Sequence, residues 1–239
     1  SEFRDSPEEH ALVKRLEKWA SKSFQKETSA EAAFLNIFFE ETWGYTPSGK
    51  AESGEGFTCY PQFPVSGAGA GGSSGKADAA LGMFERADVP GTPQILCEFK
   101  DVRSNLDAPQ KRKGNTRSPV KQCGDYLREA MKPLYGNEAI QPTWGIVTDM
   151  NEFRLYWRNT MPAQYQRFVI RRKKADDGIA LLPDVNSVTV NAEAVSFQRF
   201  LFARLLHADT LLTTGGPSRL LKLVKDQRFE EKKIEKDFY

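Results

Sequence analysis

Histidine and cysteine are scarce in this chain of 239 residues. The two histidines, His10 and His207, are too few for a histidine-based metal site or a histidine-centred catalytic triad. The three cysteines, Cys59, Cys97 and Cys123, lie far apart and form no CxxC pair. An odd number at this spacing argues against disulfides and zinc clusters. We therefore expect a reducing, cytoplasmic setting.

Long apolar segments are missing as well. No run approaches the roughly 18–20 apolar residues that a membrane-spanning helix needs. The N-terminus lacks the basic-then-apolar pattern of a signal peptide. We expect no membrane partner. With 39% hydrophobic and 28% charged residues, the composition fits one well-filled domain, with or without an appendage.

The net charge of +2 does not by itself indicate a nucleic-acid partner. Many of the basic residues nevertheless fall in two clusters, and neither cluster contains an acidic residue. The clusters are Lys111, Arg112, Lys113, Arg117 and Lys121, and Arg167, Arg171, Arg172, Lys173 and Lys174. Such clusters can bind phosphates with a salt-dependent affinity. Two solvated basic loops are an equally good interpretation.

The hydrophobic pattern predicts an α/β domain, a central mixed sheet flanked by helices. The expected helices cover 8–22, 30–43, 118–134, 192–207 and a segment from about 218, and the expected strands cover 77–84, 94–100, 143–148, 153–157 and 167–170. Ser118 followed by Pro119 is a typical helix start. A loop rich in glycine and serine, 66–75, precedes the first two strands.

The chain divides into three expected parts. We set aside 1–3 as a cloning remnant, expect the main domain at 4–190, and expect a helical segment at 191–239. Ten of the last fifteen residues are charged, and the sequence stops without a helix cap or breaker. This ending predicts an N-terminal piece of a longer protein, with a further region downstream.

The strand at 94–100 carries the residues best suited to chemistry. Successive side chains alternate between two faces, so Glu98 and Lys100 project side by side. A hairpin with the preceding strand would bring Asp78 close to Glu98. Two adjacent carboxylates repel unless a cation lies between them, and oxygen ligands favour Mg²⁺ or Mn²⁺. Such a set suffices for phosphodiester hydrolysis, with Lys100 orienting or deprotonating the water. For the ExK pattern alone, an ordinary ion pair is the alternative.

Three segments together resemble the PD-(D/E)xK nuclease superfamily, in the branch that carries a QxxxY helix. They are GKADAAL at 75–81, ILCEFK at 95–100 and VKQCGDYL at 120–127. The branch includes nuclease domains of type I restriction subunits, of single-chain type IIG and ISP restriction-modification enzymes, and of RecB-like nucleases. Ala77 replaces the proline of the family name. The resemblance covers roughly 28–160 and implies a restriction-endonuclease-like core.

The resemblance implies a role for several residues. Asp78 and Glu98 would bind the metal, with the Phe99 carbonyl as a further ligand, and Lys100 would be the catalytic lysine. Glu31 would reach the metal from the first core helix. A capping box beginning at Thr28 explains Glu31 equally well without function.

The resemblance also implies that Gln122 and Tyr126 lie near the scissile phosphate or support the lysine. They are one helical turn apart and share a face. From the residues alone, a surface amide and a half-buried aromatic are the ordinary interpretations. Arg103, Arg117 and Lys121 flank the site and could contact the DNA backbone.

The implied function is that of an endonuclease that cuts double-stranded DNA as the cleavage module of a restriction-modification enzyme. The implied cofactor is Mg²⁺, with Mn²⁺ as a substitute. The charged segment 226–239 is similar to the helical spacer that follows such nuclease domains. Methyltransferase and target-recognition regions are therefore expected downstream, and dimerisation on DNA is expected for double-strand cleavage. Two alternatives stay open: a RecB-like repair nuclease, and a non-catalytic DNA-binding or docking module of the same fold.

Overall fold

The computed structural model describes residues 2–22, 27–52, 55–69, 72–85, 92–102, 104–110, 116–130, 141–173, 178–184 and 191–238. The helices are α1 (Pro7–Ala20), α2 (Glu27–Phe34), α3 (Pro119–Glu129), α4 (Ala192–Leu205), α5 (Ala208–Leu211) and α6 (Arg219–Phe238), with a π-helical segment η1 (Leu35–Glu40) and a 3₁₀ turn η2 (Ser48–Lys50). The strands are β1 (Phe57–Val65), β2 (Gly75–Phe84), β3 (Thr92–Phe99), β4 (Trp144–Thr148), β5 (Glu152–Trp157) and β6 (Tyr165–Val169).

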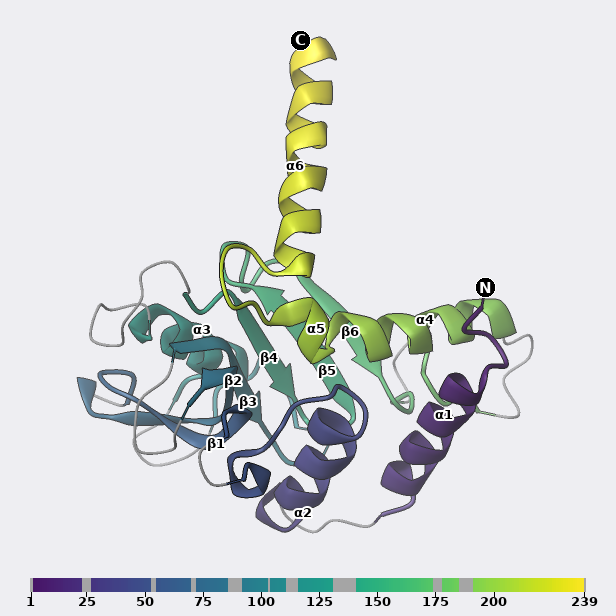
Figure 1. The fold of residues 1–239 in the computed structure, drawn as a ribbon, viewed down its shortest axis with the longest axis horizontal. Helices are drawn as coiled ribbons and strands as arrows, with labels where there is room; N and C mark the ends of the chain where they lie inside the picture. Colours follow the sequence, from purple (N-terminus) through teal and green to yellow (C-terminus); the bar gives the residue numbers. More distant parts are fainter. Residues whose placement is uncertain are drawn as a thin grey trace.

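The strands form one six-stranded sheet in the order β1-β2-β3-β4-β5-β6 (Figure 1). Neighbouring strands are antiparallel except β3 and β4, which are parallel. A parallel pair needs a long crossover connection, and α3 lies within it and packs on both strands. The expected α/β domain with a mixed sheet flanked by helices is confirmed.

Helices cover both faces of the sheet, and β3 contributes to both cores. The core beneath α3 includes Leu96, Val120, Cys123, Leu127 and Val147. The core beneath α1, α2, η1 and α4 is larger and rich in aromatic rings, including Phe34, Phe38, Trp43, Phe99, Phe153 and Phe202. The alternation expected along this strand is therefore present, with Ile95, Cys97 and Phe99 in the aromatic core and Leu96 in the core beneath α3.

Helix α4 contributes to the same core as the sheet. The ring centroid of Phe202 lies 5.1 Å from that of Phe153, and Trp43 Nε1 donates a hydrogen bond of 3.1 Å to the Phe202 carbonyl. At the opposite end of the chain, Phe3 packs edge-on against Phe200 with 5.5 Å between centroids. Residues on both sides of the 4–190 range thus contact the main body of the fold.

Strand β1 is an element that the sequence pattern did not predict. It contains Pro61 and Pro64, and proline is ordinarily excluded from the middle of a sheet because it cannot donate to the ladder. Among the described strands β1 pairs with β2 alone and forms the edge of the sheet. At an edge the missing N–H groups leave no neighbouring strand without a partner, so both prolines are tolerated.

The helix starts agree with the sequence in one case and differ in another. Ser118 Oγ accepts from the Lys121 N–H at 3.2 Å, and Pro119 opens α3, as expected. Helix α2 begins at Glu27, so Thr28 lies inside the helix. The predicted capping box, with Thr28 at the N-cap, is therefore wrong. Residues 131–134, expected to belong to α3, lie outside the described part of the chain.

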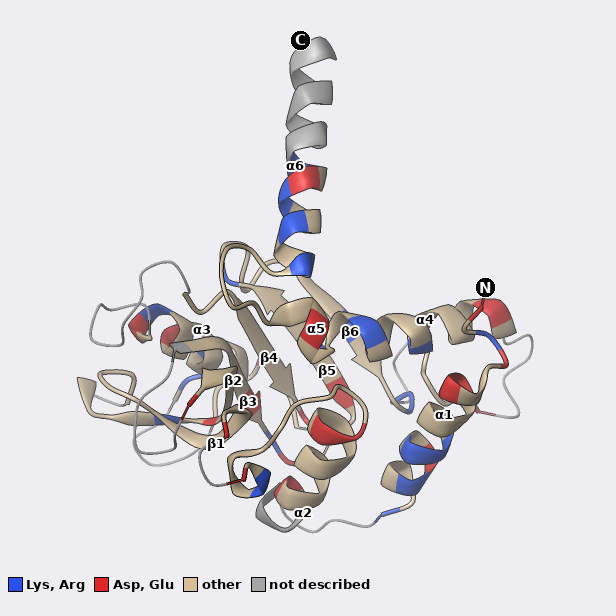
Figure 2. Cartoon of the chain, viewed as in Figure 1, with Lys and Arg blue, Asp and Glu red and all other residues tan. Residues whose placement is uncertain are grey.

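Helix α6 extends away from the sheet and the other helices (Figure 1). Charged residues recur along its first turns (Figure 2). Among the described helices, none combines the length and the apolar character that crossing a membrane requires.

Candidate active site

The pairing of β2 with β3 brings Asp78 next to Glu98. Ala80 stands opposite Leu96 in this antiparallel ladder. Every second residue of a strand shares a face, so Asp78 lies on the face of Ala80. By the same alternation Glu98 lies on the face of Leu96, beneath α3. The Phe99 N–H donates a hydrogen bond of 2.6 Å to Asp78 Oδ2, which ties the carboxylate to the end of β3.

Lys100 is held against Glu98 by two contacts. Its Nζ pairs with Glu98 Oε1 and donates to the Phe99 carbonyl at 2.8 Å. The Glu98 side chain is only 1% exposed and Lys100 is 8% exposed. Burying a lone charge is costly, so each of these two ions stabilises the other. The Lys100 N–H also donates to the Thr148 carbonyl at 2.8 Å, which extends the contact between β3 and β4 by one residue.

The donors at this end of β3 fit a hard divalent cation. Asp78 and Glu98 supply carboxylates and Phe99 a carbonyl, so all candidate ligands are oxygens. Within the described residues, no group of three or more His, Cys, Asp or Glu side chains could hold a metal. Mg²⁺ is usually bound through one or two carboxylates together with waters and substrate phosphates, which matches this set.

Gln122 and Tyr126 lie together on α3, as their spacing predicts. Gln122 Nε2 donates to Tyr126 Oη at 2.6 Å, and its Oε1 accepts from Gln110 Nε2 at 3.1 Å. Tyr126 is 2% exposed, so its ring belongs to the core beneath α3 rather than to the surface. The amide and the phenol form a fixed pair on the sheet face that carries Glu98.

The charges of Asp78 and Glu98 affect the pKa of the Tyr126 phenol. Burial is the main cause that raises the pKa of its phenol well above the ordinary value, and Glu98 and Asp78 raise it further. The hydrogen bond from Gln122 and the charge of Arg117 oppose this effect. The phenol therefore keeps its proton at neutral pH and remains available for hydrogen bonding.

The three basic residues expected to contact DNA have different surroundings. Arg117 is mostly buried and donates from Nη1 to the Ala68 carbonyl and to Asp125 Oδ2, each at 2.9 Å. It thereby links the loop after β1 to α3. Lys121 is exposed on α3, and Arg103 lies outside the described residues. A DNA contact by any of the three stays a prediction.

Glu31 contacts the edge of the sheet next to Asp78. Its Oε1 accepts a hydrogen bond of 3.2 Å from Gln62 Nε2. Phe63 pairs with Ala77, so Gln62, one residue earlier, is the cross-strand neighbour of Asp78. Gln62 has a left-handed backbone, with φ of 54°. The suggestion that Glu31 is a metal ligand stays a prediction.

The chain matches no protein-family model. Searches of curated proteins and of solved structures also found no match.

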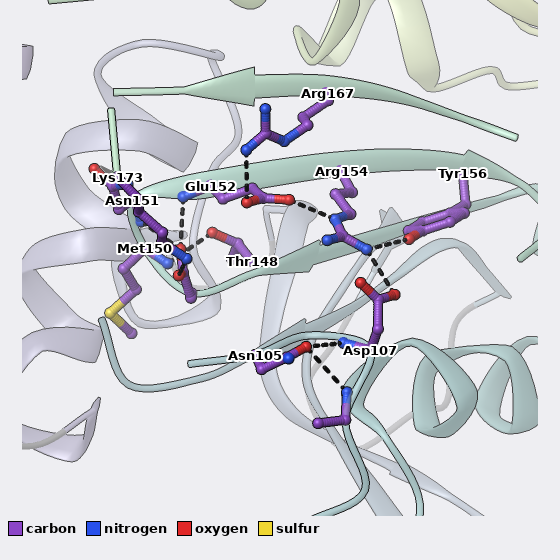
Figure 3. A network of polar contacts seen from close by, with 12 residues as sticks. Asn105, Asp107, Thr148, Met150, Asn151, Glu152, Arg154, Tyr156, Arg167 and Lys173 are labelled. Carbon is purple, nitrogen blue, oxygen red and sulfur yellow. Dashed lines mark hydrogen bonds and ion pairs between the residues drawn. The ribbon is translucent and has the colours of Figure 1, made fainter. Parts of the chain in front are cut away.

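A charged network joins β5 and β6, and of its residues the sequence analysis had named only Arg167, as part of the second basic cluster. Arg154 Nε donates to Glu152 Oε1 at 2.6 Å, and Arg167 Nη2 donates to Glu152 Oε2 at 3.1 Å (Figure 3). Arg154 Nη1 also contacts Asp107 Oδ1 and Tyr156 Oη. The available signal was the alternation within β5, where Glu, Arg and Tyr occupy every second position.

Proposed function

We propose that this chain is a metal-dependent nuclease domain that hydrolyses the phosphodiester bonds of double-stranded DNA. The observation that carries the proposal is the pairing of β2 with β3, which gathers Asp78, Glu98 and Lys100 on one sheet face. The fold would be a restriction-endonuclease-like core, and the chain would be the cleavage module of a restriction-modification enzyme. Methylation and target recognition would belong to downstream regions, and dimerisation on DNA would supply the second site for double-strand cleavage.

In this proposal each group has a defined task. Asp78, Glu98 and the Phe99 carbonyl would hold Mg²⁺, for which Mn²⁺ could substitute. The bound ion would supply Lewis-acid stabilisation of the negative charge that develops on the phosphodiester. Lys100 Nζ, fixed by Glu98 and the Phe99 carbonyl, would orient the attacking water and add positive charge beside the phosphate.

The Gln122–Tyr126 pair would form the wall of the site on the α3 side. Its hydrogen bond fixes the direction of the amide, and the buried phenol keeps its proton. Groups held in this way need no rearrangement when the phosphate binds, which favours the transition state.

The first test separates metal binding from chemistry. Wild type, Asp78→Asn and Lys100→Met are titrated with MgCl₂ and MnCl₂ by calorimetry, and nicking of supercoiled plasmid is followed in parallel. Asp78→Asn should lose both ion binding and nicking, because it removes a ligand charge. Lys100→Met should keep ion binding but slow nicking at least about 10²-fold, the typical effect of removing one positioned electrostatic group.

The matched control is Arg204→Gln, which removes an ion pair with Glu8 at the surface of α4. It should behave as wild type in both assays. A wild-type protein that neither binds the ions nor nicks plasmid would contradict the nuclease proposal. Binding of DNA without nicking in either ion would favour the non-catalytic module instead.

A further inference from the structure

The sheet face that carries Glu98 also carries two arginines on the strands toward its β6 edge. In the ladders, Glu98 pairs with Val147, Val147 with Arg154, and Arg154 with Arg167. Directly paired residues project to the same face, so both arginines share the face of Glu98. Neighbouring strands lie about 4.8 Å apart, which puts Arg154 about 10 Å and Arg167 about 14 Å from Glu98 along the sheet.

One carboxylate positions both arginines. Glu152 is buried and accepts from Arg154 through Oε1 and from Arg167 through Oε2 (Figure 3). The Arg154 guanidinium also lies over the Tyr165 ring, 4.7 Å from its centroid. Two guanidinium groups therefore share one buried carboxylate, and their orientation is set by the sheet itself.

The second carboxylate bound to Arg154 is of a different kind. Asp107 lies between β3 and α3, and its side chain is 64% exposed. Its Oδ1 lies 2.8 Å from Arg154 Nη1, and its own N–H is held by Asn105 Oδ1 at 2.9 Å. The Arg154 side chain is buried, with 10% exposed, so it depends on bound anions, whereas Asp107 contacts it from the solvent side. An anion arriving from solvent can therefore take the place of Asp107 on Arg154, whereas the buried Glu152 stays in place.

We propose that Arg154 and Arg167 form a phosphate-binding subsite for the backbone of double-stranded DNA, and that Asp107 occupies its anion position until DNA binds. The substrate class rests on the proposed nuclease function. Arginine is suited to this task because its planar fork matches a phosphate. The exposed residues Arg171 and Arg172, which follow β6, extend the positive surface.

The subsite would bind away from the cleaved bond. Phosphates of one DNA strand recur about every 3.4 Å along the helix axis. A separation of about 10–14 Å from Glu98 thus corresponds to about three or four nucleotides. The arginines would hold the duplex in register without taking part in hydrolysis.

The test measures binding of a short blunt-ended duplex by fluorescence anisotropy in EDTA, over a range of NaCl concentrations. Arg167→Gln should weaken binding about tenfold and reduce the slope of log K against log salt by about 1, as expected for one lost phosphate contact. Asp107→Asn removes the competing charge with little change in shape, so it should tighten binding. The matched control, Arg204→Gln, should bind as wild type does.

The proposal is overturned if wild type does not bind the duplex. It is also overturned if Arg167→Gln and Asp107→Asn both bind as wild type does. Plasmid nicking in Mg²⁺ separates this result from the nuclease proposal. If Arg167→Gln reduces the salt slope as expected but wild type does not nick plasmid, the subsite is supported and the nuclease proposal is rejected. If wild type nicks plasmid but neither Arg167→Gln nor Asp107→Asn changes DNA binding, only the subsite proposal is rejected.

Discussion

The single residue Gly75 shows how closely the glycine-rich loop approaches α3. A Cβ at this position would lie 3.0 Å from Tyr126 Cε1 and 3.1 Å from the carbonyl carbon of Ala68. Backbone atoms cannot move aside as a flexible side chain can. Glycine at the start of β2 therefore allows the phenol of Tyr126 to lie against the strand that carries Asp78.

We predict that Gly75→Ala lowers the free energy of unfolding by about 1–3 kcal/mol, the usual cost of overpacking. Gly49→Ala is the matched control, because a Cβ there would meet nothing within 4 Å. The control should change stability by less than about 1 kcal/mol. Denaturant unfolding of the two variants checks the prediction, and equal stabilities would contradict it.

At the scale of elements, α1 is joined to α4 by a buried ion pair. Arg199 Nη1 donates to Glu9 Oε1 at 3.0 Å, and the Asp5 N–H donates to Glu9 Oε2 at 2.8 Å. Burial, the largest effect, raises the pKa of Glu9, but these hydrogen bonds and the Arg199 charge outweigh it. The net result is a pKa below the ordinary value of 4.5.

This lowered pKa predicts a pH-dependent stability. The folded state holds the charged form of Glu9 more tightly than the unfolded state does, so the stabilisation is present above pH 4.5. It is lost as the pH falls through the folded-state pKa. Glu9→Gln should lower the free energy of unfolding by about 1–3 kcal/mol at pH 7, with a smaller difference in acid.

The neighbouring substitution Glu8→Gln supplies the control for this prediction. Glu8 pairs with Arg204 across the same two helices, but both side chains are about half exposed. Its removal should cost less than about 1 kcal/mol at any pH. Urea unfolding across the acid range distinguishes the two pairs. A constant difference between Glu9→Gln and wild type would be inconsistent with the lowered pKa.

At the scale of the whole molecule, aromatic rings connect α4 to the sheet and to the N-terminal helices. Phe202 is fully buried, and its ring lies within 6.0 Å of Phe38, Trp43, Phe153 and Phe168. We expect one cooperative unfolding transition, because no element of this core can leave without exposing the others.

We predict that Phe202→Ala lowers the free energy of unfolding by about 3–5 kcal/mol and keeps a single transition. Phe197→Ala, on the same helix, is the control because that side chain is 56% exposed. Calorimetric unfolding of both variants checks this. Two separate transitions in Phe202→Ala, with the sheet as stable as in wild type, would show that α4 is an independent unit.

Local features of this fold were predictable because nearby residues determine them. Side-chain alternation along β3 follows from strand geometry, so Glu98 and Lys100 could be assigned to one face before the structure was known. Ser118 and Pro119 mark the start of α3 for equally local reasons. The edge strand β1 was missed because proline is a local signal against a strand, and only its position in the sheet makes it acceptable.

By itself, therefore, the sequence determined most helices, most strands, and the association of Asp78 with Glu98 and Lys100 through a hairpin. Only the tertiary structure decided which distant segments lie beside this cluster. The parallel pairing of β3 with β4 and the antiparallel pairing of β4 with β5 bring Arg154 onto the face of Glu98. Strand order depends on burying both sheet faces at once. No local pattern encodes that condition.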